Sequence, residues 1–418
     1  MERACFGAAA AVTVGWFLCF ARFFPDYLVD EAGHLGNVYH FLEHKPGWPE
    51  QMTMLPGYHF VVAALWQLRP PVTLLTLARL VTMLLSLLGL AAFALAHRRL
   101  RERRPRSAGT MGAGPATLLL ALLPVLQPFT GMAYTDAPAL ALVLAAFSLQ
   151  LGEHRAAAAL AFATATLFRQ TNLLWAGFVV VWEFLREDAP RRDFPRRVRW
   201  LLLLIAASAT VVLATGRFTV GTQTGTAARP NIATLHFAAL LMLVLGLPVW
   251  LAALPAAARR VANAVRSHPV RAVAGAMGLA IVIAVLTRTF ANPHIWNREL
   301  FWTGCTFTLL RNWPLVWIDH HAWLRWASAA NVVLMSGALA SVIARQRSTR
   351  RELLLALACG AVLPLANNLV EPRYFIPALA FVLLLAEIDA ANGRRLAAWW
   401  ALLCACHAPF IARGLSLW

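Results

Sequence analysis

Apolar runs long enough to cross a membrane alternate with short polar segments along nearly the whole chain. A spanning helix needs about 17 to 25 mostly apolar residues, and the first run, at residues 5–22, meets that length. No small-x-small cleavage site follows it, so we interpret it as a spanning helix and not as a secretory signal peptide. The pattern predicts twelve more spans, at residues 74–97, 115–132, 136–152, 156–171, 173–186, 199–215, 234–257, 270–290, 323–345, 353–369, 373–389 and 396–412.

Residues 292–322 do not fit this pattern. The segment is irregular and rich in aromatic residues, with Trp296, Trp302, Trp313 and Trp317. Tryptophan is enriched at the membrane–water interface, so we expect an interfacial or re-entrant segment on the outer face. A spanning helix here would instead invert the side of every later loop.

The composition agrees with a membrane protein. Hydrophobic residues make up 60% of the 418 positions and charged residues only 13%, whereas soluble domains have about 45–50% apolar and about 25% charged residues. A chain of this length with so little charge cannot build the polar surface of a soluble enzyme. We therefore predict an all-α polytopic membrane protein, with about 12–14 transmembrane helices in one integral membrane domain over residues 1–418.

Basic residues outnumber acidic ones, 37 to 19. Such an excess can indicate nucleic-acid binding, but here the arginines gather in short clusters between apolar runs, which is typical of cytoplasmic loops. With Met1 in the cytoplasm, the predicted spans place all five clusters on the cytoplasmic side. These clusters are His97–Arg106, Arg186–Arg199, Arg259–Arg271, Arg345–Arg351 and Arg394–Arg395.

The opposite side of the membrane receives a different set of polar residues. These residues occur singly along the chain, and several of them lie in the long first outer loop, residues 23–57. Ionisable groups beside membrane segments are costly, so they usually form pairs or take part in chemistry. We therefore expect the active face outside the cytoplasm, around Asp26, Asp30, Glu31, Asp136, Arg169, Arg298, Glu299, Glu371 and Arg373.

Asp30 and Glu31 are adjacent acids in the first outer loop. One of them would act as general base toward an acceptor hydroxyl while the other orients it or meets a cation. The alternative is a helix N-terminus, where the helix dipole stabilises acids. Asp136 likewise fits either a helix cap or a functional group, and Arg169 and Arg373 fit either a phosphate site or structural ion pairs.

The histidines of the first outer loop raise the question of a metal site. His40 and His44 are spaced as an i, i+4 pair with Glu43 between them, a pattern compatible with zinc. No HExxH motif forms, and interfacial loops commonly carry histidine. We predict no metal site, and whether a divalent cation assists stays open. The six cysteines show no ligand-like spacing.

Several of these outer-face segments, taken in order, resemble one family: the dolichyl-phosphate-glucose-dependent alpha-1,2-glucosyltransferases of asparagine-linked glycosylation. Leu167–Asn172 is similar, nearly residue for residue, to the family's LFRQTN signature. The other segments that carry the resemblance are Val29–His34, Thr53–Tyr58, Tyr134–Asp136, Asn297–Arg298 and Leu369–Phe375.

The resemblance implies a GT-C-type bundle that adds the third, terminal glucose to a dolichyl-diphosphate-linked oligosaccharide. The donor would be dolichyl phosphate glucose, so no cofactor and no nucleotide site are required. By analogy with the first-loop acid of these enzymes, Asp30 would be the base, supported by Glu31. Arg169 and Arg373 would neutralise the leaving lipid phosphate. The sugar pocket and remaining substrate contacts would involve His34, Tyr58, Asp136, Gln170, Asn172, Arg298, Glu371 and Tyr374.

The resemblance also implies a location and partners. It places the protein in the endoplasmic reticulum membrane, with a lumenal active site in contact with membrane lipid and lipid-linked sugars, and it implies no nucleic-acid partner. One alternative is a bacterial GT-C enzyme of the inner membrane, with a periplasmic active site and another polyprenyl phosphate sugar as donor. The alternative from another class is a polytopic lipid or sugar transporter, which would place polar residues on broken helices at mid-membrane.

Overall fold

The computed structural model describes residues 2–28, 30–49, 52, 54–103, 109–187, 189–216, 231–294, 312–346, 348–367 and 369–412. Within these ranges the regular structure is helical, and an isolated β-bridge joins Thr110 to Asp389. Lipid offers no partner for backbone polar groups, so a helix, which satisfies them internally, suits these apolar runs. The predicted all-α class is confirmed.

The helices follow one another in short connections. Their bounds are α1 (Glu2–Phe23), α2 (Glu31–Leu42), α3 (Gly57–Trp66), α4 (Leu74–Arg103), α5 (Ala113–Ala121), α6 (Asp136–Leu151), α7 (Arg155–Phe168), α8 (Leu173–Leu185), α9 (Phe194–Thr215), α10 (Ala233–Ser267), α11 (Pro269–Thr289), α12 (Trp313–His320), α13 (Ala322–Arg345), α14 (Arg350–Ala366), α15 (Ile376–Leu385) and α16 (Ala390–Ala412). Short 3-10 turns are η1 (Gln127–Thr130), η2 (Gln170–Asn172), η3 (Arg191–Asp193) and η6 (Pro372–Phe375).

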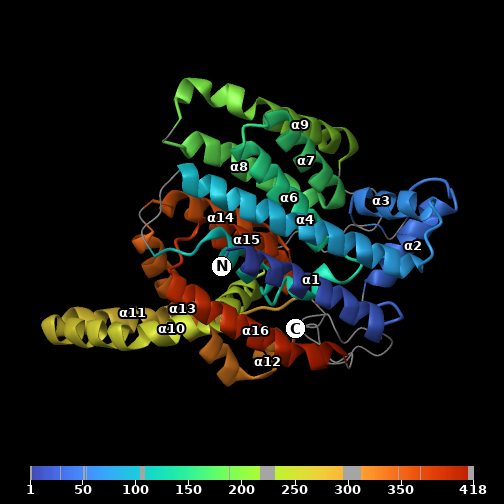
Figure 1. Cartoon of the computed structure of the whole chain (residues 1–418). Coiled ribbons are helices and arrows are strands. Elements are labelled where there is room, and N and C mark those ends of the chain that lie inside the picture. The colour runs from blue at the N-terminus through green and yellow to red at the C-terminus, as the bar shows by residue number, and fades with distance from the viewer. Residues whose placement is uncertain are drawn as a thin grey trace.

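Six described helices are long and apolar enough to cross a membrane. They are α1, α4, α9 extended by η3, α10, α11 and α13. The expectation of a multi-pass membrane protein is confirmed. Between α1 and α4 the chain forms two short helices, α2 and α3, which lie together at one side of the molecule (Figure 1).

One predicted span is wrong as a single helix. Residues 115–132 form the short helix α5, which ends at Ala121, and then the separate turn η1. Pro124 and Pro128 lie in this stretch, and proline lacks the N–H that continues a helix. The chain still passes from beside Glu2 at the start of α1 to beside Phe20 near its end, so this crossing is made by a broken segment and not by one helix. The segment predicted at 234–257 instead runs on to Ser267, as the end of α10.

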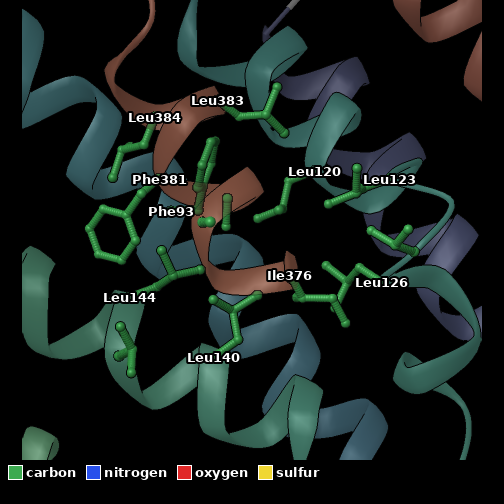
Figure 2. Packing of buried hydrophobic residues seen from close by; sticks show 14 of the residues in the cluster. Phe93, Leu120, Leu123, Leu126, Leu140, Leu144, Ile376, Phe381, Leu383 and Leu384 are labelled. Carbon is green, nitrogen blue, oxygen red and sulfur yellow. The ribbon is translucent and has the colours of Figure 1, made fainter. Parts of the chain in front are cut away.

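The core lies where α4, α5, α6 and α15 meet (Figure 2). Phe93 of α4, Leu120 of α5 and Phe381 of α15 are buried there. Small residues let the helices approach closely, as is usual between membrane helices. A side chain on Gly89 of α4 would lie 2.9 Å from the Cβ atom of Ala141 on α6.

Four of the five basic clusters belong to one end of this bundle. Arg103, at the end of α4, donates to the carbonyl of Leu151 at 2.5 Å, and Arg351 pairs with Glu187. Backbone bonds join the loop before α5 to the start of α16. The fifth cluster lies at the turn between α10 and α11, which extend together away from the rest of the bundle (Figure 1).

Candidate active site

Five segments converge at the end of the bundle opposite to the basic clusters. They are the chain after α1, the start of α2, the turn before α6, the turn between α7 and α8, and the turn before α15. Contacts join their polar side chains across long sequence distances, as between Arg373 and Asp30. The structure thus brings together most of the outer-face residues that the sequence singled out.

Asp30 precedes the first residue of α2, but its side chain makes no capping hydrogen bond. Its backbone N–H donates to the phenol oxygen of Tyr134 at 3.2 Å. Its side chain is 41% exposed, and Oδ2 of its carboxylate lies 3.4 Å from Nη1 of Arg373. The backbone of Asp30 is therefore held in place while a carboxylate oxygen remains accessible to a ligand.

Tyr134 joins Asp30 to the rest of the cluster. It is fully buried, and the guanidinium of Arg373 lies 5.5 Å from the centre of its ring. Burial and the nearby Asp30 raise the pKa of the Tyr134 phenol, in spite of the charge on Arg373. The phenol therefore stays protonated at neutral pH and keeps its hydrogen-bonding role.

Glu371 and Asp136 each have one carboxylate oxygen paired with an arginine and one without a partner among the described residues. Nε of Arg373 donates to Oε2 of Glu371 at 2.5 Å, and Arg169 pairs with Oδ1 of Asp136. Among the described residues, Oε1 of Glu371 and Oδ2 of Asp136 are buried without a hydrogen-bond partner. Burial raises the pKa of the Glu371 carboxyl, against the lowering effect of Arg373. Buried polar atoms are rarely left unsatisfied, so these two oxygens indicate a place for a ligand.

A small cavity lies beside these pairs. Its polar end is formed by Asp136, Arg169 and Arg373, and Trp175 and Leu363 contribute to its apolar wall. Tyr374 also lines it. The volume is about 30 Å³, close to that of one water molecule. A sugar phosphate would enter only if the ion pairs opened to accept it.

Two neighbouring residues of the turn between α7 and α8 were also predicted to bind substrate. Asn172 donates to the carbonyl of Ala165 at 2.9 Å and so closes the end of α7. It also contributes to the lining of the cavity. Gln170 begins the turn η2 between the two helices.

His34 is buried beneath Asp30. Its Nδ1 lies 3.1 Å from Nε2 of His59, and its ring meets that of Tyr134 edge on, with 5.1 Å between centres. Burial, together with the charges of Arg373 and Arg169, lowers the pKa of His34 to about 3. The imidazole is therefore neutral at pH 7 and acts by packing and hydrogen bonding.

Tyr58 lies beside His34, with 6.3 Å between the centres of the two rings. The Tyr58 hydroxyl is buried against α4, where it donates to the carbonyl of Ala78 at 2.9 Å and meets Thr82. Its hydroxyl joins α3 to α4, and its ring meets that of His34 edge on. Arg298 lies outside the described residues.

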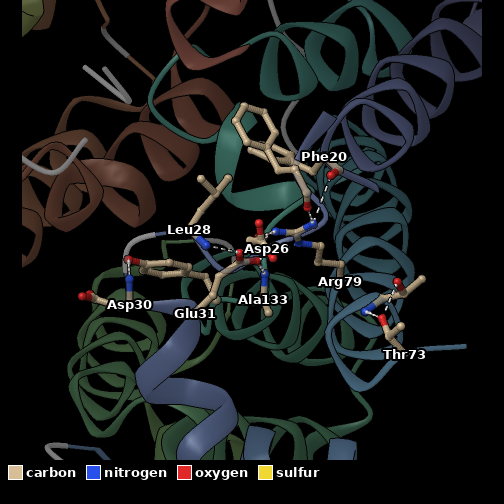
Figure 3. A network of polar contacts seen from close by, with 11 residues as sticks. Phe20, Asp26, Leu28, Asp30, Glu31, Thr73, Arg79 and Ala133 are labelled. Atoms are coloured by element: carbon tan, nitrogen blue, oxygen red, sulfur yellow. Dashed lines mark hydrogen bonds and ion pairs between the residues drawn. The ribbon is translucent and has the colours of Figure 1, made fainter. Parts of the chain in front are cut away.

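Glu31 is fully buried and holds a guanidinium that the sequence analysis did not single out. Arg79 of α4 binds it with two bonds, from Nε to Oε1 at 2.9 Å and from Nη2 to Oε2 at 2.6 Å (Figure 3). The signal that could have revealed Arg79 is its isolation inside an otherwise apolar run, since a charge in such a place usually has a buried partner.

Within the described residues, no group of three or more His, Cys, Asp or Glu side chains is placed to hold a metal ion. In the pair considered for zinc, Nε2 of His40 lies 3.0 Å from the carbonyl oxygen of Gly47.

Comparison with known proteins finds relatives for part of the chain. The model of the DIE2/ALG10 family matches residues 24–195. A Dol-P-Glc:Glc(2)Man(9)GlcNAc(2)-PP-Dol alpha-1,2-glucosyltransferase of Rattus norvegicus is 30% identical over 174 residues, 39% of this chain and 36% of that protein. A Homo sapiens protein of the same name is 29% identical over 194 residues, 43% of this chain and 41% of that protein. The chain therefore spans well under two thirds of the length of these relatives, and over that part the predicted resemblance is confirmed.

A solved structure, ArnT from Cupriavidus metallidurans bound to undecaprenyl phosphate, aligns with 97% of this chain and 78% of its own, with 16% identity and a TM-score of 0.40. The family match covers Asp30, Glu31, Asp136 and Arg169. Glu371 and Arg373 lie beyond it and reach the same site through the fold alone.

Proposed function

We propose that this protein is an inverting glycosyltransferase that moves glucose from dolichyl phosphate glucose to the diglucosylated dolichyl-diphosphate-linked oligosaccharide through an alpha-1,2 bond. The observation that carries the proposal is Asp30: an accessible carboxylate beside Arg373, on a fixed backbone, inside the segment that matches the family.

The reaction requires one base. Asp30 takes the proton from the acceptor hydroxyl, and the resulting oxygen attacks the anomeric carbon of the donor. The bond from that carbon to the phosphate oxygen breaks, and the lipid phosphate leaves from the opposite face with the electron pair. Attack from the opposite face converts a beta-linked donor into an alpha-linked product.

Glu31 serves this reaction as a support and not as a second base. Each of its carboxylate oxygens accepts two hydrogen bonds from described residues, among them both bonds from Arg79. A base needs an accessible lone pair, which Asp30 has and Glu31 lacks.

Arg169 and Arg373 neutralise the charge that develops on the leaving phosphate. In the structure each pairs with an acid, Asp136 and Glu371 respectively. The donor phosphodiester offers a bidentate acceptor with one negative charge, and the leaving lipid phosphate gains a second, so the guanidinium groups bind it more strongly as the bond breaks. The remaining oxygens of Asp136 and Glu371 accept hydrogen bonds from sugar hydroxyls, which places the sugar beside Asp30.

A lipid-linked substrate suits the surroundings of the site. An apolar cavity of about 340 Å³ lies between α10, α12 and α16, and Asn312 is among its lining residues. Asn312 donates to the carbonyl of Val370, next to Glu371, at 3.4 Å. A lipid phosphate sugar brings its own leaving group, so no cofactor enters the reaction. The proposed location is the endoplasmic reticulum membrane, with the site in the lumen.

The test is transfer by the purified full-length protein. Dolichyl phosphate glucose and the diglucosylated lipid-linked oligosaccharide are incubated with it, and mass spectrometry reads the addition of one hexose. We expect transfer by the wild type and a loss of about 10²–10⁴-fold in Asp30→Asn. Asp26→Asn is the matched control, because Asp26 is an exposed acid of the same loop and should retain the rate.

Each other outcome revises the proposal. Transfer of a different sugar from another polyprenyl phosphate would replace the donor and keep the chemistry. Movement of lipid across a vesicle membrane without a covalent product would favour the transporter. Near-normal turnover by Asp30→Asn would remove the assignment of the base.

A further inference from the structure

Arg79 is a fully engaged cation in the interior. The side chain lies on α4 and is 1% exposed. Two of its N–H groups bind the carboxylate of Glu31. Its other bonds go to the carbonyl oxygens of Phe20 at 3.0 Å, Phe24 at 2.5 Å and Asp26 at 3.1 Å. A guanidinium has five N–H donors, so all of them are used.

The acceptors of Arg79 belong to the segment that leads to Asp30. Phe20 is near the end of α1, and Phe24 and Asp26 follow it on the chain that crosses to α2. The described residues between Phe23 and Glu31 belong to neither helix and so lack the regular backbone hydrogen bonds of one. Arg79 therefore supplies the bonds that set the path of the chain before Asp30 (Figure 3).

Glu31 fixes the chain on the other side of Asp30. Its carboxylate accepts the N–H of Leu28 at 2.8 Å and the N–H of Ala133 at 2.7 Å. Ala133 precedes Tyr134, whose phenol oxygen receives the N–H of Asp30. The ion pair thus ties the first outer loop, α4 and the turn before α6 at one point (Figure 3).

We propose that Arg79 is a positioning residue that holds Asp30 in place for the transfer. The inference rests on the proposed function. Arg79 makes no contact with Asp30 or with the cavity and acts through Glu31 and the three carbonyl oxygens. A lysine retains the charge that Glu31 requires but cannot form the same fork of five donors, so Arg79→Lys should loosen the segment that carries Asp30.

A similar buried pair provides the control. Arg197 donates to Oε2 of Glu183 at 2.9 Å and to the carbonyls of Pro190 and Glu183. It lies at the end of the bundle with the basic clusters, away from Asp30. Arg197→Lys makes the same chemical change in a comparable environment and should lower thermal stability to a similar degree.

The experiment compares the initial rates of Arg79→Lys and Arg197→Lys in folded, purified protein. A displacement of about 1 Å at a reacting group costs about 100-fold in rate. We expect kcat of Arg79→Lys to fall by about 10- to 100-fold, with KM for both substrates within about threefold of the wild type. Arg197→Lys should keep kcat within about twofold. Equal kcat values in the two variants would overturn the inference.

A double-mutant cycle asks whether Arg79 acts through Asp30. In the Asp30→Asn background the base is already lost, so adding Arg79→Lys should change the residual rate by less than about threefold. A further loss equal to that in the wild-type background would show a general structural effect and would also overturn the inference.

A second variant covers the case in which Arg79→Lys does not fold. The pair Glu31→Gln and Arg79→Gln removes both charges together, so no unpaired charge is left buried. The folded double variant should still lose kcat by about 10-fold or more, and wild-type kcat would overturn the inference. Absence of transfer by the wild type itself would contradict the proposed function, an outcome distinct from all of these.

Discussion

Acid–arginine pairs are buried at both ends of the bundle, but they are completed differently. At the end with the basic clusters, both carboxylate oxygens of Glu183 are occupied, one by Gln150 and the other by Arg197 and Arg186. At the opposite end, Glu371 and Asp136 each keep one buried oxygen without a partner among the described residues. Glu183 itself is complete, as expected of a structural contact, and the open acceptor there, among the described residues, is the amide oxygen Oε1 of Gln150. At the opposite end the open acceptors belong to the acids themselves, where a ligand can use them.

The same distinction separates two neighbours in the sequence. Glu31 accepts four hydrogen bonds from described groups, whereas the carboxylate of Asp30 meets Arg373 at 3.4 Å and its side chain is 41% exposed. A carboxylate whose oxygens all accept hydrogen bonds from the protein, as in Glu31, has a structural role. A carboxylate with few such bonds, as in Asp30, is available to a substrate.

The largest effect on kcat is expected at the end of the bundle that carries the candidate site. Arg373→Gln removes a donor to the leaving phosphate, and loss of one such preorganised donor costs about 10²–10³-fold in kcat. Arg373→Lys, which keeps the charge but not the fork, should fall between this variant and the wild type. Initial rates of glucose transfer measure both. A kcat of Arg373→Gln within about threefold of the wild type would mean that this pair is structural as well.

The matching change at the other end should affect stability and not rate. Glu183→Gln removes the counter-charge of the buried Arg197, and breaking a buried pair costs about 3–5 kcal/mol. We expect a lower melting temperature, measured by intrinsic fluorescence in detergent, with the rate per folded molecule within about twofold of the wild type. A selective loss of rate in fully folded protein would break the comparison between the two ends.

The smallest predicted effect concerns the burial of His34 at the end of the bundle that carries the candidate site. The pKa of His34 is about 3 in the folded protein and ordinarily 6.5, so the unfolded chain binds the proton first as pH falls. Above about pH 6.5 the protonation of His34 does not lower the free energy of unfolding. Below that pH the free energy of unfolding falls progressively toward pH 3, by on the order of 2 kcal/mol at pH 5.

His34→Gln should remove that part of the pH dependence. Melting temperatures of the wild type and the variant, measured from pH 7.5 to pH 5, give the difference directly. His40→Gln is the control, because His40 is only partly buried on the same helix. Identical slopes for the wild type and His34→Gln would mean that solvent reaches this side chain.

Much of the fold could be predicted from the apolar pattern. Most predicted spans correspond to helices because a long apolar run in lipid must satisfy its backbone internally. The break after Ala121 could also have been predicted, since Pro124 and Pro128 were visible in the sequence. The candidate site was predicted in part, because its motifs resemble those of a family and fall on one side of the membrane.

The roles within the site depended on distant contacts. The residues alone left the roles of Asp30 and Glu31 interchangeable, and only the family resemblance named Asp30 as the base. In the structure they differ because Arg79, 48 residues from Glu31, binds the carboxylate of Glu31. Tyr58, which lies in a resemblance segment, bonds to α4 with its hydroxyl and packs its ring edge on against His34.

By itself, the sequence determined the helices, their apolar character and the grouping of charges by side, because these follow from local chemistry in contact with lipid or water. The tertiary structure alone decided which carboxylate stays accessible, which arginine supports it and which acids keep a vacant oxygen. The accessibility of a polar group and its hydrogen bonds depend on neighbours that the fold brings from as far as 343 residues along the chain.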